Sequence, residues 1–182
     1  MRSQRGQIPT GKRNGLNQKI NAQLLKFVAE KKPLSLAAFW SFDGEPNLRP
    51  ALGILADRNL QVALPLVSGV YQGTMTFSRW HPGSKMSENQ FNILEPVGEA
   101  PMAMADLDLL LVPLVAWDRK GNRLGMGGGY YDRLMEARRT EIRPLRVGVA
   151  YGLQEVEKVP VSANDVPLHG VICEYGWTVF EQ

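Results

Sequence analysis

Apolar and polar residues alternate along the chain in two patterns, one typical of amphipathic helices and one typical of buried strands. From residue 16 to residue 29, apolar residues recur mostly three or four positions apart, which predicts a helix. Lys31-Lys32-Pro33 follows, and proline cannot continue that helix. Short apolar runs predict strands at 34–40, 61–67, 107–116 and 145–150. The run at 107–116 is apolar on both faces, so we expect it to be a central parallel strand.

Further elements are predicted between these runs. A short helix is expected at 48–56, where Pro50 is tolerated because it falls in the first turn, and another helix at 130–138. Weaker patterns predict a strand at 74–77, an extended piece of loop at 91–96, and edge strands at 170–173 and 178–180. Strands that alternate with helices predict an α/β fold with right-handed crossovers. In such a sheet, ligands bind at the carboxyl ends of the strands.

Composition restricts the class of protein. A chain of 182 residues is expected to form a single domain with one solid core, and its 44% hydrophobic and 21% charged residues are close to globular norms. The only cysteine, Cys173, excludes an internal disulfide framework and fits a reducing compartment. The longest apolar run, 107–117, is well short of the ~20 residues that a membrane helix needs. No signal peptide opens the chain, so we expect a cytoplasmic protein without a membrane partner.

Positive charge is concentrated in residues 1–30, which we expect to form a basic helical arm. The net charge is +3, yet six basic residues precede the first acid, Glu30. Such an arm could meet phosphate groups, a polyglutamate tail or RNA, or it could be the solvated face of a helix, which charge alone favours. Aromatic residues that would stack on bases are absent between Met1 and Lys26, so nucleic acid is not an expected partner.

The main candidate site is the glycine-rich segment Arg123–Arg133 (RLGMGGGYYDR). Glycine occupies four of the five positions from 125 to 129, so no side chains obstruct the loop there. We expect the loop to follow the 107–116 strand at once and to lead into the 130–138 helix, where its N–H groups can bind an anion. Arg123 and Arg133 add positive charge, and Asp132 is a hard oxygen ligand suited to phosphate-bound Mg²⁺. The alternative is a tight turn that merely requires glycine; these residues alone support a phosphate site and no more.

A longer stretch around this loop resembles the signature of the 5-formyltetrahydrofolate cyclo-ligase (5,10-methenyltetrahydrofolate synthetase) family. The stretch consists of Leu109–Asp118 followed by Gly121–Arg133. Three other pieces resemble the family's substrate-side segment, its central loop and its C-terminal segment: Ser41–Glu45, Asn92–Pro96, and Val159–Val161 with Asn164–Pro167. The resemblance covers residues 35 to 175 in the family's order.

The resemblance implies an enzyme with a three-layer α/β sandwich, in which helices flank a mostly parallel central sheet. Members use ATP and Mg²⁺ to convert 5-formyltetrahydrofolate, with or without a polyglutamate tail, into 5,10-methenyltetrahydrofolate. ATP phosphorylates the formyl oxygen, N10 attacks the activated carbon, and phosphate leaves. Such a reaction requires dispersal of charge on the phosphoryl group and a close approach of N10, but no acid–base dyad. A monomer is expected.

The resemblance also implies roles for individual residues. Arg123 and Tyr130 are the expected catalytic residues, and Asp132 and Asp165 the expected Mg²⁺ ligands. On these residue types alone, Asp165 could instead be a turn-former, Glu45 plain loop and Trp40 part of the core. The expected folate contacts are Trp40, Glu45, Met126 and Tyr130. The expected ATP contacts are Arg2, Arg5, Arg123, Leu124, Gly125, Met126, Gly127, Gly128, Gly129, Tyr130 and Tyr131.

The N-terminus departs from the family's pattern. The family usually opens with a Lys-x-x-x-Arg helix, and Met1 falls just after the matching position, so we expect a truncated arm in which Arg2 and Arg5 substitute. This departure motivates an alternative hypothesis, a family member that binds folate or nucleotide without turnover. Asn47-Leu48 also replaces the family's commoner acid-Thr pair, which leaves the capping of the 48–56 helix open.

Overall fold

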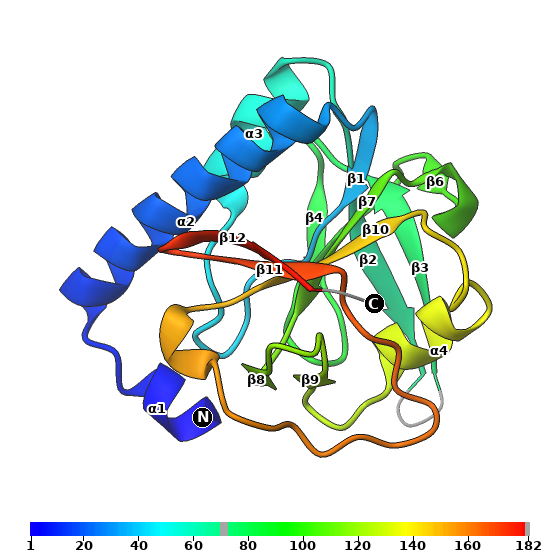
Figure 1. The fold of residues 1–182 in the computed structure, drawn as a ribbon. Coiled ribbons are helices and arrows are strands. Elements are labelled where there is room, and N and C mark those ends of the chain that lie inside the picture. Colours follow the sequence, from blue (N-terminus) through cyan, green and yellow to red (C-terminus); the bar gives the residue numbers. More distant parts are fainter. Residues whose placement is uncertain (70–72, 181–182) are drawn as a thin grey trace.

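Eight strands form one central sheet in the part of the chain that the computed structural model describes, residues 1–69 and 73–180 (Figure 1). Their order from one edge to the other is β12-β11-β10-β7-β1-β2-β3-β6. Neighbours from β11 to β2 run parallel, whereas β12, β3 and β6 pair antiparallel, which confirms the predicted α/β fold. The strands are β1 (Ser35–Ala37), β2 (Gln61–Ser68), β3 (Thr74–Arg79), β6 (Pro101–Met102), β7 (Leu109–Pro113), β10 (Leu145–Val149), β11 (Gly170–Cys173) and β12 (Gly176–Val179).

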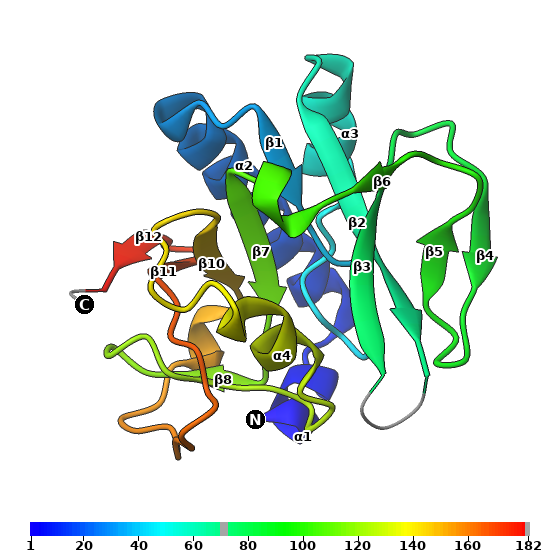
Figure 2. The ribbon, with the colours of Figure 1, turned by 90° about the vertical axis from the view of Figure 1, so that its right-hand side faces the viewer.

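Helices cover both faces of this sheet. The long helix α2 (Thr10–Lys31) and α3 (Arg49–Asp57) lie on one face, and α4 (Tyr130–Glu136) lies on the other, as Figures 1 and 2 show. The short helix α1 (Arg2–Gly6) lies near the N-terminal end of α2. Two single-turn 3₁₀ helices, η1 (Met104–Asp106) and η2 (Gly152–Gln154), complete the helical elements of the described chain.

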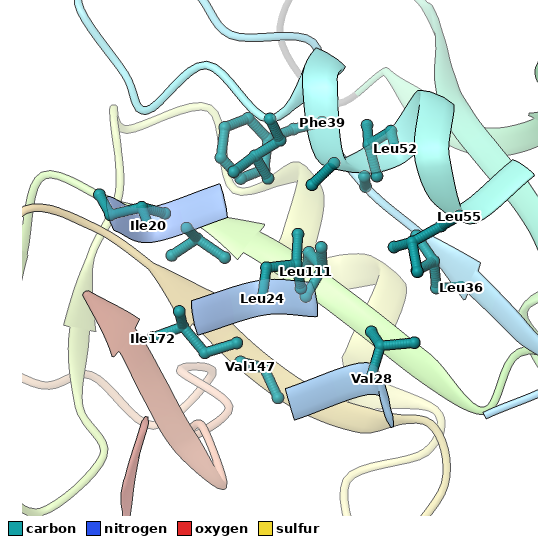
Figure 3. Close-up of a cluster of buried hydrophobic side chains, with 14 of the residues drawn as sticks. Ile20, Leu24, Val28, Leu36, Phe39, Leu52, Leu55, Leu111, Val147 and Ile172 are labelled. Atoms are coloured by element: carbon teal, nitrogen blue, oxygen red, sulfur yellow. The ribbon is translucent and has the colours of Figure 1, made fainter. Parts of the chain in front are cut away.

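The apolar face of α2 forms the core on its side of the sheet. Ile20, Leu24 and Val28 point toward the central strands, where Leu111 and Val147 are fully buried (Figure 3). The three- and four-residue spacing places these helix residues on one face, as predicted. The helix ends at Lys31, and the next residue, Lys32, has a left-handed backbone (φ 50°) just before Pro33.

No helix of the described residues is long and apolar enough to cross a membrane.

Several predicted boundaries change in the structure. The strand expected at 34–40 covers only Ser35–Ala37, because residues 38–40 leave the sheet. Of the two predicted edge strands, Gly170–Cys173 lies between two other strands, and only the last one, shifted to Gly176–Val179, lies at an edge. Residues 91–96 are partly strand, since β5 (Leu94–Pro96) pairs with β4 (Met86–Glu88) as a separate two-stranded ribbon. The remaining predicted helices and strands are present, each shifted at its ends by a few residues at most or lengthened.

The prediction that the glycine loop follows the central strand directly is wrong. A two-stranded ribbon, β8 (Ala116–Trp117) with β9 (Arg123–Leu124), lies between them. Its turn is held by the buried Asp118 carboxylate, which accepts N–H bonds from Lys120 at 2.9 Å and Asn122 at 3.1 Å. The ribbon therefore separates the glycines from the central strand, and Arg123 is its last but one residue.

Candidate active site

A cavity of about 550 Å³ opens where the parallel strands β1, β2 and β7 end, at the edge of the sheet that the fold class predicts for a ligand. Its walls come from the segment after β1, the end of β2 with the β4–β5 ribbon, the glycine loop with the start of α4, and residues 160–165. Segments distant in sequence therefore meet here. The polar and aromatic part of the lining includes Trp40, Glu45, Asn89, Phe91, Glu95, Arg123, Tyr130, Tyr131, Asp132 and Asp165.

The glycine loop forms an exposed wall of this cavity. Gly129 has a left-handed backbone at φ 64°, and a methyl group there would lie 2.7 Å from the Arg133 guanidinium. By contrast, Gly125 has no positive φ, and a methyl group there would meet no protein atom within 4 Å. The fold therefore requires glycine at the end of the loop but not at its beginning. Open space over the first glycine favours a bound group as the reason for its small size.

Arg123 connects three parts of the site. It is 8% exposed, and its Nη1 donates to the carbonyl of Val166. Its Nη2 donates to Asp132 Oδ1 at 2.5 Å, and that same oxygen accepts the Val166 N–H at 3.3 Å. The charge of Arg123 is thus shared with a carboxylate, and its role in ATP binding stays a prediction.

Two carboxylates face the cavity from different segments. Asp132 comes from α4, while Asp165 accepts the Ser162 N–H at 2.7 Å within a turn. No group of three or more His, Cys, Asp or Glu side chains suited to a metal occurs within the described ranges. A bound Mg²⁺ would therefore take its remaining oxygens from phosphate and water, as this ion usually does. The two hard oxygen donors fit such an ion, and their metal role stays a prediction.

Glu45 is buried at the cavity rather than exposed in a loop. It is 8% exposed, and its carboxylate accepts the Phe42 N–H at 3.1 Å. Burial raises the pKa of Glu45 to about 7, opposed by this hydrogen bond and by the nearby charge of Arg5. A carboxyl group that titrates near neutral pH inside a cavity is a candidate for binding polar N–H groups.

Aromatic side chains line the same space. The edge of the half-buried Trp40 ring lies against Trp80, with ring centroids 6.2 Å apart, and Arg49 lies over its face at 5.0 Å. The Tyr130 hydroxyl donates to the Gly69 carbonyl at 2.8 Å, and its ring is 6.2 Å from that of Phe91. Both predicted aromatic contacts thus border the cavity, as does the 49% exposed Met126.

The sequence predicted Tyr131 as an ATP contact, but it predicted neither the environment of the Tyr131 hydroxyl nor a role for Glu95. The Tyr131 hydroxyl is buried without a hydrogen-bond partner among the described residues, and burial followed by the charge of Glu45 raises its pKa. Glu95 accepts the Val67 N–H at 2.8 Å and the Asn89 amide at 2.6 Å, which anchors the β4–β5 ribbon. The family-like segment Asn92–Pro96 pointed to this ribbon but gave no role for the glutamate.

Two predicted ATP contacts, Arg2 and Arg5, do not line the cavity. The Arg2 side chain is 59% exposed and pairs with Asp43 at 2.6 Å. Arg5 is fully buried and bonds to Asp43 and to the Leu114 carbonyl. Both charges are paired with Asp43 in this structure, so neither side chain faces the cavity here, and their role in ATP binding stays a prediction.

The fold and the cavity together define an α/β protein with a small-molecule site at the carboxyl ends of its parallel strands, beside a glycine-rich loop. Residues 1–174 match the 5-formyltetrahydrofolate cyclo-ligase family. The chain is also 36% identical over 157 residues to the 5-formyltetrahydrofolate cyclo-ligase of Haemophilus influenzae, across 85% of this chain and 83% of that protein. The chain therefore belongs to the 5-formyltetrahydrofolate cyclo-ligase family.

Other relatives agree over nearly the full length. The 5-formyltetrahydrofolate cyclo-ligase of Escherichia coli K12 is 33% identical over 175 residues, 94% of this chain and 95% of that protein. The solved structure of the Aquifex aeolicus 5,10-methenyltetrahydrofolate synthetase gives a TM-score of 0.84 at 30% identity, covering 100% of this chain and 89% of that one. The family resemblance found in the sequence is thus confirmed.

Proposed function

We propose that this protein converts 5-formyltetrahydrofolate into 5,10-methenyltetrahydrofolate with consumption of ATP. One observation carries the proposal: the glycine loop, Glu45 and Trp40 come from separate parts of the chain and line one cavity in a member of this family. A loop suited to an anion beside an acid and an aromatic ring fits a phosphate donor next to a pterin. Relatives that carry the names of this activity support the same reading.

The nucleotide side of the site is the glycine loop with the two facing carboxylates. When bound, MgATP supplies the phosphoryl group that turns the formyl oxygen into a leaving group. The exposed N–H groups of residues 125–129 would hold the phosphates, and Asp132 and Asp165 would hold the metal. Arg123 keeps Asp132 and the segment around Val166 in fixed positions, so both carboxylates stay directed at the same space. Fixed donors of this kind disperse charge on a transferred phosphoryl group.

The folate side of the site is formed by Glu45, Trp40 and Tyr130. An ionised Glu45 would accept hydrogen bonds from the N3–H and 2-amino groups of the pterin ring, which present two adjacent donors. The Trp40 and Tyr130 rings would flank the pterin. The apolar remainder of the lining excludes water, and a folate held at both ends keeps N10 close to the formyl carbon. Because ring closure is intramolecular, such positioning supplies a large part of the rate acceleration.

Binding without turnover is the second candidate, and one observation favours it. Among the described residues that line the cavity, Arg123 is the sole basic side chain, and it is paired with Asp132. A transferred phosphoryl group would then depend on backbone N–H groups and the metal for its stabilisation.

A spectroscopic assay separates the two candidates. Methenyltetrahydrofolate absorbs in the near ultraviolet, where 5-formyltetrahydrofolate does not. Protein mixed with MgATP and 5-formyltetrahydrofolate should raise this absorbance with release of one ADP for each product, and omission of ATP should abolish the rise. Tight folate binding in a calorimeter together with no rise in absorbance would reject turnover and leave the binding protein.

A further inference from the structure

Arg5 has all three of its guanidinium nitrogens engaged inside the protein. The side chain is fully buried, and Nε and Nη2 donate to the Asp43 carbonyl at 3.1 and 2.9 Å. Nη2 also reaches the Asp43 carboxylate at 3.1 Å, and Nη1 donates to the carbonyl of Leu114 at 3.1 Å. Arg5 therefore ties the turn at Asp43 to the residue that follows the central strand β7.

That turn is the one that carries Glu45 into the cavity. Asp43 and Gly44 both have left-handed backbones, at φ 49° and 76°, and the Glu45 N–H donates to the Phe42 carbonyl at 3.0 Å. A left-handed Asp43 is a strained position that surrounding contacts have to hold. Arg5, which does not line the cavity, supplies these contacts through the carbonyl and the carboxylate of Asp43.

Helix α2 holds the other end of the same segment. Asn21 Nδ2 donates to the Asn47 carbonyl at 2.7 Å, and Asn17 Oδ1 accepts the Asn47 N–H at 3.2 Å. The N-terminal region thus forms hydrogen bonds to both ends of the segment 43–47. In this arrangement it supports the acid of the cavity rather than contributing charge to a phosphate.

We propose that Arg5 is a positioning residue for the folate side of the site, which fixes the turn at Asp43 so that the Glu45 carboxylate is presented, ionised, to the pterin. This inference rests on the proposed function. The positive charge of Arg5 lowers the pKa of Glu45 against the stronger, raising effect of burial, while Asp43 raises it. Two tyrosines also face Glu45, Tyr131 and Tyr151, and both stay neutral at physiological pH because burial raises their pKa values.

The first experiment compares Arg5→Met and Arg5→Lys with the wild type in the absorbance assay, with KM measured separately for folate and for MgATP. Arg5→Met should raise the folate KM about tenfold, the equivalent of one lost charge-assisted hydrogen bond, with the MgATP KM changed less than twofold. Arg5→Lys should restore part of this loss. Arg2→Met is the matched control, since it removes an arginine from the same Asp43 carboxylate without touching a backbone carbonyl, and it should change the folate KM less than twofold.

The pH profile of kcat/KM for folate tests the route through Glu45. Because the ionised acid binds the pterin, kcat/KM should rise with pH, with a midpoint near 7 set by Glu45. Arg5→Met should move this midpoint upward, Arg5→Lys should leave it in place, and Asp43→Asn should move it downward. In a Glu45→Gln background, Arg5→Met should add little to the folate KM.

Three results would overturn the inference. The first is an equal rise of the folate KM and the MgATP KM in Arg5→Met. The second is a double variant in which the effects of Arg5→Met and Glu45→Gln on the folate KM multiply, and the third is an unshifted pH midpoint in Asp43→Asn. The Asp43→Asn variant keeps the carbonyl contacts, so it decides the question even if Arg5→Met does not fold. Failure of the proposed function would look different, because the wild type itself would then form no methenyl product.

Discussion

At the scale of single residues, the ionised form of the buried Glu45 lowers the stability of the folded state. Its folded-state pKa of about 7 lies above the ordinary value of 4.5 for a glutamic acid, because burial penalises the ionised form. A group whose folded pKa is raised stabilises the fold below its unfolded pKa, and that contribution is lost as the pH rises through the folded pKa. Above pH 7 the protein thus keeps a buried charge, which in the proposed function accepts hydrogen bonds from the pterin.

Glu45→Gln should therefore separate stability from function. At pH 8 the variant should be more stable than the wild type by on the order of 3 kcal/mol, while at pH 4.5 the difference should nearly vanish. The same change should raise the folate KM, since the amide presents only one acceptor oxygen. Urea unfolding at the two pH values measures the first effect, with the exposed Glu88→Gln as the control. An equal gain at both pH values would contradict an ionised Glu45 as its cause.

Arg123 is the second residue whose environment makes a prediction. Arg123→Met removes the guanidinium donor from the Val166 carbonyl, leaves the Asp132 carboxylate with the Val166 N–H alone, and should destabilise the fold by roughly 2 kcal/mol. Because Asp132 loses its orientation, the Mg²⁺ concentration needed for half-maximal rate should rise more than the folate KM. Titration of Mg²⁺ at saturating ATP checks this. A rise in the folate KM alone would contradict the assignment of Arg123 to the nucleotide side of the site.

At the scale of elements, the glycine loop offers a matched pair of substitutions. Gly125→Ala meets no protein atom within 4 Å and no positive φ, so it should change stability by less than about 0.5 kcal/mol. Gly129→Ala places a methyl group at φ 64° and 2.7 Å from Arg133, and should destabilise by about 1 kcal/mol or more. If the first glycine leaves room for phosphate, Gly125→Ala should raise the MgATP KM at least tenfold despite its normal stability. An unchanged MgATP KM would mean that the loop is only a tight turn that requires glycine for its backbone.

Local pattern predicted most elements, and it failed where distant residues decide the path of the chain. The 107–116 run and the helix after the glycines were found because burial and periodicity are local signals. The β8–β9 ribbon was missed because Asp118, which holds its turn, also accepts the N–H of Val159, 41 residues further on. Arg5 was assigned to phosphate as a substitute for the family's N-terminal basic pair, and its pairing with Asp43, 38 residues away, could not be seen in the sequence.

The candidate site was predicted better than the connections that build it. Family-like segments identified Trp40, Glu45 and the loop, and the structure places all of them around one cavity. Motifs keep the groups that face a ligand, so such residues can be found without knowing the fold. Arg5 bonds to the turn that precedes Glu45, and the Tyr131 hydroxyl has no hydrogen-bond partner among the described residues. Both features depend on packing between separate segments, and no local pattern encodes them.

At the scale of the whole molecule, the cavity exists only when the entire sheet is assembled. Its lining runs from Phe39 to Asp165, and the sheet beneath it is held between two apolar clusters, one under α2 and α3 and one under α4. A ligand that binds this cavity binds the folded state alone, so its binding free energy adds to the stability of the complete fold. Thermal unfolding therefore reports on each half of the site without any requirement for turnover.

Separate additions of MgATP and 5-formyltetrahydrofolate should each raise the melting temperature, by roughly 5–10 °C at a hundredfold excess over Kd. Glu45→Gln should lose most of the folate shift and keep the MgATP shift, because the acid comes from the segment after β1 and not from the glycine loop. Gly125→Ala should show the reverse, a retained folate shift with a reduced MgATP shift. The exposed Glu88→Gln should keep both shifts. Equal loss of both shifts in either variant would mean that the two ligands do not occupy separate halves of the cavity, and the roles assigned to Glu45 and the loop would have to be abandoned together.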